Sequence, residues 1–473
     1  MCGALFWIRV KESKNRETQN LVPGREALLV WARVAAMSFG GPAGQIAVMH
    51  RILVEEKKWI SEARFLHALN YCMLLPGPEA QQLATYIGWM LRGFKGGLVA
   101  GGLFILPGFL SILALSVLYV LYQGSFFLES LFFGLKPAVI AIVFAALVRI
   151  ASKSLKTKAM IVTAAASFIA IFIFAVPFPA VILVASAAGF FAGRYFPQQY
   201  DVVQQHPTSG EETDCLDVIS KHRTAQAKPS LRQSLKLLTV FLTLWLLPLA
   251  ILYRTLGGEN VFTQIGIFFS KAAVVTFGGA YALLSYLAQQ AVHHYHWLEA
   301  HQMMDGLGMA ETTPGPLIQV TQFVGFMGAY GAAMQNLPGT PSPLVAGLLA
   351  SVLTTWVTYV PCFLWIFLGA PYIEFLRGYK KLTYALSSIS AAVVGVILNL
   401  GLWFSLHVLF KNLVVHEKGP FHVMLPEWNS LNLPALVLTL IACFLVFKLK
   451  WNIFKTMGTA VILGFVFNLI YKV

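Results

Sequence analysis

Long apolar runs, broken by short polar stretches and by glycine and proline, dominate the pattern along this 473-residue chain. Many of these runs approach the roughly 20 residues that a helix needs to cross a lipid bilayer. They lie at residues 98–121, 131–148, 159–175, 178–192, 235–252, 344–368, 382–404, 433–447 and 459–470. Other segments are apolar but interrupted. The pattern predicts an all-α polytopic membrane protein with about ten to thirteen embedded helices.

One long polar stretch separates two apolar halves. It contains Pro207 and Pro229, charges of both signs and no apolar run, which is typical of a solvated linker. We predict an N-terminal cytoplasmic tail (1–25), a first membrane domain (26–197), the linker (198–233) and a second membrane domain (234–473). The tail has no apolar signal-peptide core, so we expect the first embedded helix to direct insertion.

Four motifs of the first half recur in the second half at one fixed offset, 277 − 39 = 238 residues. The pairs are Phe39-Gly40-Gly41 with Phe277-Gly278-Gly279, Trp59 with Trp297, Pro76-Gly77-Pro78 with Pro314-Gly315-Pro316, and Gln81 with Gln319. A gapless register of this kind indicates an internal repeat. A half-to-half repeat is typical of membrane transporters.

The basic residues favour opposite orientations of the two halves. Residues 39–76 contain four lysines and arginines, whereas the matching residues 277–314 contain none. Conversely, residues 377–381 contain three basic residues where the first half has none. Lysine and arginine collect in cytoplasmic loops, so this complementarity predicts an inverted repeat. Inversion needs an odd number of crossings before the second half, and the interrupted runs leave that number open.

The Gly-Gly and Pro-Gly-Pro motifs inside apolar runs predict helix breaks at membrane depth. Broken backbone is tolerated there only inside protein or beside a wet cavity. A helix that begins at such a break directs free N–H groups and a positive partial charge at the cavity, which suits an anion. Packing kinks are the alternative. The repeated register favours a site with up to four helix starts, suited to a tetrahedral dianion.

The candidate substrate-binding residues are the break motifs and the polar residues beside them. They are Gly40, Gly41, Pro42, Gln45, Pro76, Gly77, Pro78, Gln81 and Gln82 in the first half, and Gly278, Gly279, Thr312, Thr313, Pro314, Gly315, Pro316 and Gln319 in the second.

Three charged residues are further candidates. Glu79 and Glu311 are candidates for proton coupling, because an ionised carboxylate deep in a bilayer costs about 2.5–3.5 kcal/mol on insertion scales. A place near an interface or a basic partner is the alternative for each, and their repeat counterparts, Leu317 and Met73, are apolar. Arg51 is a candidate for attracting an anion, with a topology anchor as its alternative.

Composition supports the membrane assignment. Hydrophobic residues make up 58% and charged residues 11% of the chain, and the mean hydropathy is +0.70. The net charge of +14 is expected from cytoplasmic loops, and no nucleic-acid-binding signature accompanies it. The five cysteines are isolated, and the histidines at 293–301 have no established zinc spacing. We therefore predict no metal and no cofactor. Without a nucleotide or redox motif we expect no enzyme.

Residues 38–108 resemble the first domain of long-chain members of the chromate ion transporter superfamily. The resemblance rests on SFGGPAGQIAVMH, the segment around LLPGPEAQQLATYIGW, and GGLVAGGLFILPG. In the second half it rests on TFGGAY, the segment around ETTPGPLIQV, and Pro361-Cys362-Phe363. It covers nearly the whole chain except the tail and the linker. One departure is Ala280 at the position of Pro42, which predicts a softer second Gly-Gly break.

The resemblance implies a secondary transporter in the bacterial cytoplasmic (inner) membrane that exports chromate and confers chromate resistance. It implies sulfate as an anion that competes for or shares the pathway. An oxyanion uptake carrier for sulfate is the alternative in the same class, because a carrier's direction depends on gradients and coupling. A membrane-embedded chromate reductase is disfavoured because the sequence has no redox site. The expected partners are chromate, sulfate and the lipid bilayer, and a homodimer stays open.

Overall fold

The apolar runs form helices, as the sequence predicts. The computed structural model describes residues 22–196 except Leu74, 231–370 except Gly278, and 380–471 except Pro420. Within them, seven helices are long and apolar enough to cross a membrane, and three shorter helices are apolar as well. These ten fall in the predicted range and confirm an all-α polytopic fold. The predicted tail and linker lie almost wholly outside the described residues, so the domain boundaries stay a prediction.

The two halves contain the same succession of elements. The first half comprises α2 (Gly24–Met37), α3 (Gly41–His50), η1 (Arg51–Glu56), α4 (Glu62–Cys72), α5 (Glu79–Leu121), α6 (Phe126–Ser154), α7 (Lys158–Phe172) and α8 (Phe178–Tyr195). After the extra helix α10 (Leu231–Leu256), the second comprises α11 (Val261–Val275), α12 (Ala280–Leu287), η2 (Ala288–His294), α13 (Ala300–Thr312), η3 (Leu317–Gln319), α14 (Val320–Met334), α15 (Pro343–Gly369), α17 (Lys380–Leu409), α18 (Leu433–Cys443), η6 (Phe444–Lys448) and α19 (Ile453–Tyr471).

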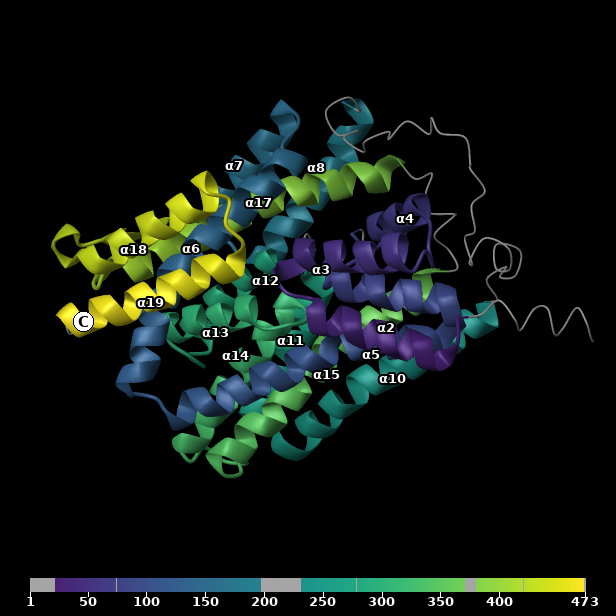
Figure 1. Cartoon of the computed structure of the whole chain (residues 1–473), viewed down its shortest axis with the longest axis horizontal. Coiled ribbons are helices and arrows are strands. Elements are labelled where there is room, and N and C mark those ends of the chain that lie inside the picture. Colours follow the sequence, from purple (N-terminus) through teal and green to yellow (C-terminus); the bar gives the residue numbers. More distant parts are fainter. Residues whose placement is uncertain are drawn as a thin grey trace, which may run out of the picture.

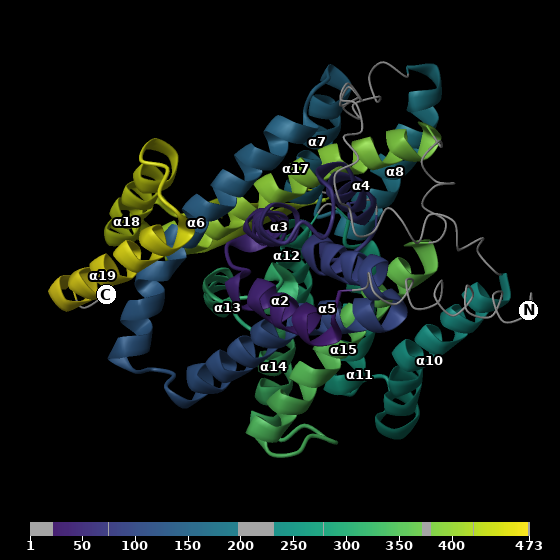
Figure 2. The same ribbon diagram turned by 45° about the vertical axis from the view of Figure 1, so that its right-hand side comes forward.

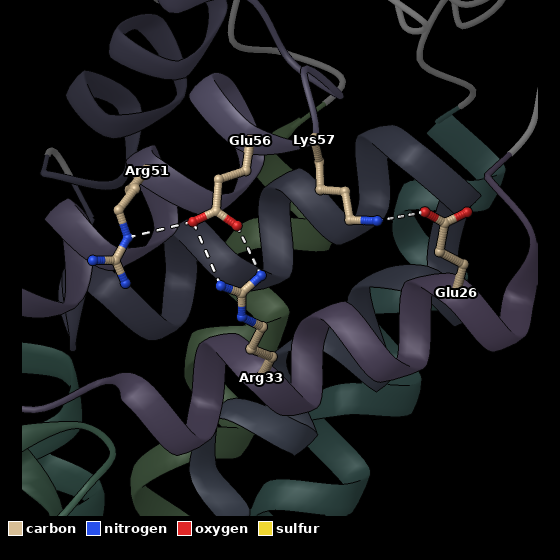
Figure 3. Close-up of polar contacts among 5 residues, drawn as sticks. All are labelled: Glu26, Arg33, Arg51, Glu56 and Lys57. Carbon is tan, nitrogen blue, oxygen red and sulfur yellow. Dashed lines mark hydrogen bonds and ion pairs between the residues drawn. The ribbon is translucent and has the colours of Figure 1, made fainter.

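Helices α2 and α3 form a hairpin that turns at Ser38–Gly40. Its open end is closed by two ion pairs, Lys57 to Glu26 at 2.8 Å and Arg33 to Glu56 at 2.7 Å (Figure 3). Both ion pairs link α2 to the end of η1, which continues α3. The two arms of the hairpin therefore run antiparallel. Each is too short to cross a bilayer core of about 30 Å at 1.5 Å per residue. The hairpin therefore enters and leaves on one side of the membrane.

A second hairpin follows, made of α4 and the first part of α5. Helix α5 has 43 residues, too many for one crossing, and its backbone breaks at Arg92 and Gly93. Beyond this break the chain folds back on itself, because Gly88 lies against the backbone of Gly96 and against Ala100. The part of α5 before Arg92 thus returns to the side from which α4 came, and the part after Gly93 crosses the membrane.

The second half repeats both hairpins with different side chains. Helices α11 and α12 turn at Thr276–Gly279, and α13 and α14 turn at Pro314-Gly315-Pro316. The ion pairs of the first hairpin are replaced by aromatic contacts, with Tyr295 and Trp297 stacked at a ring distance of 4.4 Å. Lys58 and its counterpart His296 even share an unusual left-handed backbone, both with φ of 52°.

The halves are inverted in the membrane. Among the described residues, the crossings before the second half are the second part of α5, then α6, α7, α8 and α10, which is an odd number. The crossing count left open by the sequence therefore agrees with inversion. The loops after η1, α6 and η6 contain Lys57, Lys156 and Lys450, and the positive-inside rule places them in the cytoplasm. The first pair of hairpins then enters from the cytoplasm and the second pair from outside.

The peripheral helices are exchanged between the halves. The yellow helices α18 and α19 of the second half pack along α6 of the first, and α17 packs along α7 and α8 (Figure 1, Figure 2). Glycines permit the close approach: a Cβ at Gly464 would lie 2.6 Å from Gly134 Cα, and one at Gly189 would touch Ser388. The hydrophobic core accordingly contains residues of both halves.

The second half also carries a short β-hairpin between α17 and α18. Strands β1 (Leu413–Lys418) and β2 (Phe421–Pro426) pair antiparallel. The backbone N–H of His422 donates a 2.7 Å hydrogen bond to the carbonyl of Ile173, between α7 and α8. The hairpin thus covers the outer end of the first half.

The close packing of the exchanged helices predicts that two glycines of α19 tolerate substitution differently. Gly464→Ala is expected to lower stability by about 1–3 kcal/mol, because the new methyl group meets backbone that cannot rotate away. Gly458→Ala is the matched control, since nothing lies within 4 Å of a Cβ there. Thermal unfolding in detergent measures both variants, and equal melting temperatures would contradict the close packing.

Candidate functional site

The tips of the four hairpins meet through two reciprocal hydrogen bonds. The N–H of Gly77 donates to the carbonyl of Thr276 at 2.8 Å, and the N–H of Gly315 donates to the carbonyl of Ser38 at 2.8 Å. Both donors are the central residues of Pro-Gly-Pro motifs, and both acceptors precede Phe-Gly-Gly motifs. The repeat offset of 238 relates one bond to the other. The two predicted kinds of break therefore form one centre, and each break of one half is completed by the other half.

Four helices begin at this centre: α3, α5, α12 and η3. Among the described residues no side chain caps these four starts. Elsewhere, Ser125, Thr157, Asn260 and Asn432 cap the starts of α6, α7, α11 and α18, whereas α2, α4, α8 and α15 also begin without a side-chain cap. The first N–H groups of a helix have no partner within it. Four uncapped starts leave these donors available for an anion.

Both Phe-Gly-Gly segments break the helix fully. The positive φ of 80° at Gly40, 70° at Gly41 and 94° at Gly279 are conformations that favour glycine. The expectation of a softer second break is wrong, because α11 ends at Val275 and α12 begins only at Ala280. The carbonyl of Thr276 accepts a hydrogen bond from Gly77, so it cannot accept one within a continuous helix. This hydrogen bond interrupts the helix although the segment lacks the proline of the first half.

The predicted glutamines are buried, and two of them bind the broken backbone. Gln45 donates to the carbonyl of Gly315 at 2.6 Å, and Gln82 donates to the carbonyl of Pro76 at 2.7 Å. Gln81 donates to Thr85 at 3.1 Å, while Gln319 accepts from Tyr359 at 2.7 Å. Gln45 and Gln82 therefore satisfy carbonyls that the breaks expose, whereas Gln81 and Gln319 bind side chains. In this conformation the donors open to an anion are backbone N–H groups.

The two predicted carboxylates both lie beside the centre. Tyr281 donates to Glu311 at 2.6 Å, and its hydroxyl also lies 3.7 Å from a Cβ position at Gly41 of the other half. The second oxygen of Glu311 is buried and has no partner among the described residues. Glu79 is the first residue of α5, and one of its oxygens lies 3.7 Å from a Cβ position at Gly279.

Helices of opposite halves press on the Pro-Gly-Pro turns. A Cβ at Gly108 of α5 would lie 2.8 Å from the carbonyl oxygen of Pro314, and a Cβ at Gly77 would lie 2.8 Å from the sulfur of Cys362 in α15. Gly108 and Cys362 are themselves repeat counterparts, at an offset of 362 − 108 = 254. The sequence shows this second offset in the matching segments Pro107-Gly108-Phe109 and Pro361-Cys362-Phe363. Both segments belong to the family resemblance, but they were not paired with each other from the sequence alone.

Some predicted residues lie elsewhere. Arg51 is half-exposed in η1 and pairs with Glu56 at 3.6 Å on the exposed side of the first hairpin, which favours the anchor role (Figure 3). Thr312 and Thr313 donate to carbonyls of their own helix, Gly308 and Ala310. Gly278 lies outside the described residues. The histidines at 293–301 belong to no metal-holding cluster in the described part of the chain.

Sequence reasoning missed a buried polar group between α6 and α13. Lys136 pairs with Asp305 at 3.2 Å, and Tyr119 donates to the same carboxylate at 2.9 Å. Tyr281 and Tyr359, the partners of Glu311 and Gln319, were also missed. A charged residue inside an apolar run was the available signal for Lys136 and Asp305. The tyrosines resemble other core aromatic residues and gave none.

Paired breaks within an inverted repeat are typical of transporters that bind their substrate at the repeat interface. A chromate transporter family profile matches residues 25–190 and 263–466, most of the chain. The chain belongs to the chromate transporter family. The two matched regions correspond to the two structural halves and leave out α10 and the segment before it.

Several relatives support the membership. The chromate transport protein of Pseudomonas aeruginosa is 30% identical over 76% of this chain and 76% of its own length. The chromate transport protein of Cupriavidus metallidurans is 28% identical over 79% and 80%. The probable chromate transport protein of Synechococcus elongatus is 28% identical over 77% and 80%. No solved structure matches the chain significantly.

The contact between α5 and the second Pro-Gly-Pro turn predicts that substitution of two glycines of α5 affects transport differently. Gly108→Ala is expected to reduce transport at least tenfold, because its methyl group meets the carbonyl of Pro314 and displaces the turn that supplies Gly315. Gly102→Ala, on the same helix with nothing within 4 Å of its Cβ, is expected to transport normally. Chromate flux normalised to protein in the membrane measures both, and a normal Gly108→Ala would show that the contact is dispensable.

Proposed function

We propose that this protein exports chromate from the bacterial cytoplasm across the inner membrane and thereby confers chromate resistance. The observation that carries the proposal is the set of four uncapped helix starts around the two reciprocal hydrogen bonds, Gly77 to Thr276 and Gly315 to Ser38. Chromate is a tetrahedral dianion with acceptor oxygens only, so it suits a site whose free donors are backbone N–H groups. Relatives named chromate transport proteins support the substrate class.

The proposed substrate site consists of the break residues predicted from the sequence, with three additions. Gly40, Gly41 and Gly279 present the N–H groups of α3 and α12, while the turns at Gly77 and Gly315 orient α5 and η3. Gln45 and Gln82 hold this backbone in place, and Gln81 and Gln319 lie beside it in hydrogen bonds with Thr85 and Tyr359. We add Tyr281, Tyr359 and Gly108, which position Glu311, Gln319 and the second turn.

Direction follows from the charge of the substrate. A cell that is negative inside favours the exit of a dianion by about 2.3 kcal/mol per charge per 100 mV. Export therefore needs no nucleotide, in keeping with the lack of a nucleotide-binding motif. Sulfate has the same shape and charge as chromate, and we propose that it competes for the same site.

Glu79 and Glu311 are proposed to couple transport to protons. An ionised Glu79 at the start of α5 would occupy the N–H groups that an oxyanion needs, so the two negative groups exclude one another. Protonation of Glu79 removes this competition. Glu311 is already bound by the hydroxyl of Tyr281, which leaves its second oxygen free to accept a proton.

Radiolabelled chromate flux in everted membrane vesicles tests the export proposal. Accumulation inside the vesicles that depends on this protein, and that excess sulfate inhibits, is the expected result. Uptake by intact cells without accumulation in everted vesicles would instead identify an importer. Flux in neither preparation would overturn oxyanion transport.

The coupling proposal predicts altered pH dependence in two variants. Glu79→Gln and Glu311→Gln are expected to flatten the pH profile of chromate flux, because an amide cannot exchange a proton at this site. Glu299→Gln, at the exposed start of α13, is the control and should keep the wild-type profile. If both site variants keep the rate and the profile of the wild type, proton coupling through these residues is lost.

A further inference from the structure

One face of α6 changes from apolar to cationic where its neighbour α13 ends. Leu135 and Val139 contact Gly308 of α13, and Ile142 and Ala146 continue the same stripe in buried positions. The stripe then places Arg149 and Lys153 in exposed positions. A helix returns to the same face at spacings of three and four residues, and these six positions are spaced 4, 3, 4, 3 and 4 apart.

The register of the two helices places these cations beyond the last turn of α13. Lys136 pairs with Asp305 and Val139 contacts Gly308, so α6 and α13 run parallel. Helix α13 ends at Thr312, and the chain then turns through Pro314 to Pro316 at the centre. Helix α6 continues to Ser154. Its last stripe positions therefore lie on the cytoplasmic side of the second Pro-Gly-Pro turn, on the face of α6 that points to it.

The stripe and the register thus place both cations on the cytoplasmic side of the centre, one turn apart near the end of α6. Neither cation forms an ion pair with any residue that the structure describes, and both are exposed. Two unpaired cations on a face that packs inward are costly in lipid, so water must reach them.

A dianion site flanked by two carboxylates needs positive charge nearby. The helix starts provide only partial charges of about half a unit each. Nothing in the break motifs themselves is cationic, and Arg51 pairs with Glu56 instead. Arg149 and Lys153 are one helical turn apart, which lets both act on a single tetrahedral oxyanion.

We propose that Arg149 and Lys153 form a cationic binding site for tetrahedral oxyanions on the cytoplasmic approach to the central breaks. They concentrate the dianion at the mouth of the pathway and offset the negative charge of Glu79 and Glu311 as it passes inward. A surface of one charge sign raises the local concentration and the arrival rate of an opposite ion, and salt weakens the effect. The inference rests on the proposed function, since it names the residues that load the same site.

Variants that remove one charge each test this inference. Arg149→Gln and Lys153→Gln are expected to raise the half-saturating chromate concentration in everted vesicles roughly tenfold each, and the double variant about a hundredfold, with little change in maximal rate. The salt dependence of wild-type flux should weaken in parallel. Arg149→Lys, which keeps the charge, should stay close to wild type and shows that the position itself tolerates substitution.

The neighbouring loop offers matched controls. Lys156 lies in the loop after α6 and Lys158 is the first residue of α7; both are exposed and lie beyond the end of the stripe. Lys156→Gln and Lys158→Gln should leave the half-saturating concentration within twofold of wild type. If the Arg149 and Lys153 variants match these controls, the two cations only anchor α6 at the membrane surface and the inference is overturned.

Direct binding separates this inference from the proposed function. Equilibrium binding of radiolabelled chromate and sulfate to purified wild type and double variant should show weaker binding in the variant for both anions. If the wild type binds and transports an oxyanion and the double variant binds it equally well, the cationic site alone is overturned. Wild type that neither binds nor carries chromate or sulfate overturns both proposals.

Discussion

Backbone polar groups without partners are costly at membrane depth, several kcal/mol for each, and four helix breaks meet at the centre of this protein. The reciprocal bonds from Gly77 to Thr276 and from Gly315 to Ser38 answer this constraint. Neither half can satisfy its own breaks, because each Pro-Gly-Pro donor finds its acceptor in the opposite half. Folding of the centre therefore requires both halves, and the pairing fixes where the two sets of hairpin tips can lie.

The close packing around the centre follows from the same bonds. For the turns to reach across, backbone must approach backbone, so Gly108 faces Gly315 with no room for a side chain between them. The exchanged outer helices have the same requirement, since Gly134 and Gly464 touch directly. Alternating access needs these contacts to shift as units, because close-packed interfaces change between discrete arrangements more readily than they deform. The exchange of α6 and α17 packs one long helix of each half against helices of the other half.

Much of this architecture could be predicted from the sequence, for reasons that particular residues make clear. Glycine and proline disfavour a continuous helix, so they mark helix breaks in the sequence. The repeat of these motifs at an offset of 238 residues therefore located Gly40, Gly77 and their counterparts without a structure. The pairing of breaks across halves could not be predicted, because a backbone hydrogen bond leaves no side-chain signature. The partners of Gln45 and Gln82 could not be predicted for a related reason: the sequence shows an amide in an apolar run but not which carbonyl it binds. Tyr281 gave no signal, since only the fold places its hydroxyl on Glu311.

The two halves share their breaks but differ in their charges, so the symmetry of the backbone does not extend to the electrostatics. The pseudo-symmetric backbone, with its reciprocal bonds and uncapped helix starts, offers two equivalent ways to open. Glu79, Glu311, Lys136 and Asp305 have no charged counterparts of the same kind, because Leu317, Met73, Ser390 and His67 stand at the related positions. Nor do Arg149 and Lys153, whose stripe on α6 corresponds to Trp403 and His407 on α17. The backbone of the centre is therefore nearly symmetric, whereas the charges around it make its two sides electrostatically different.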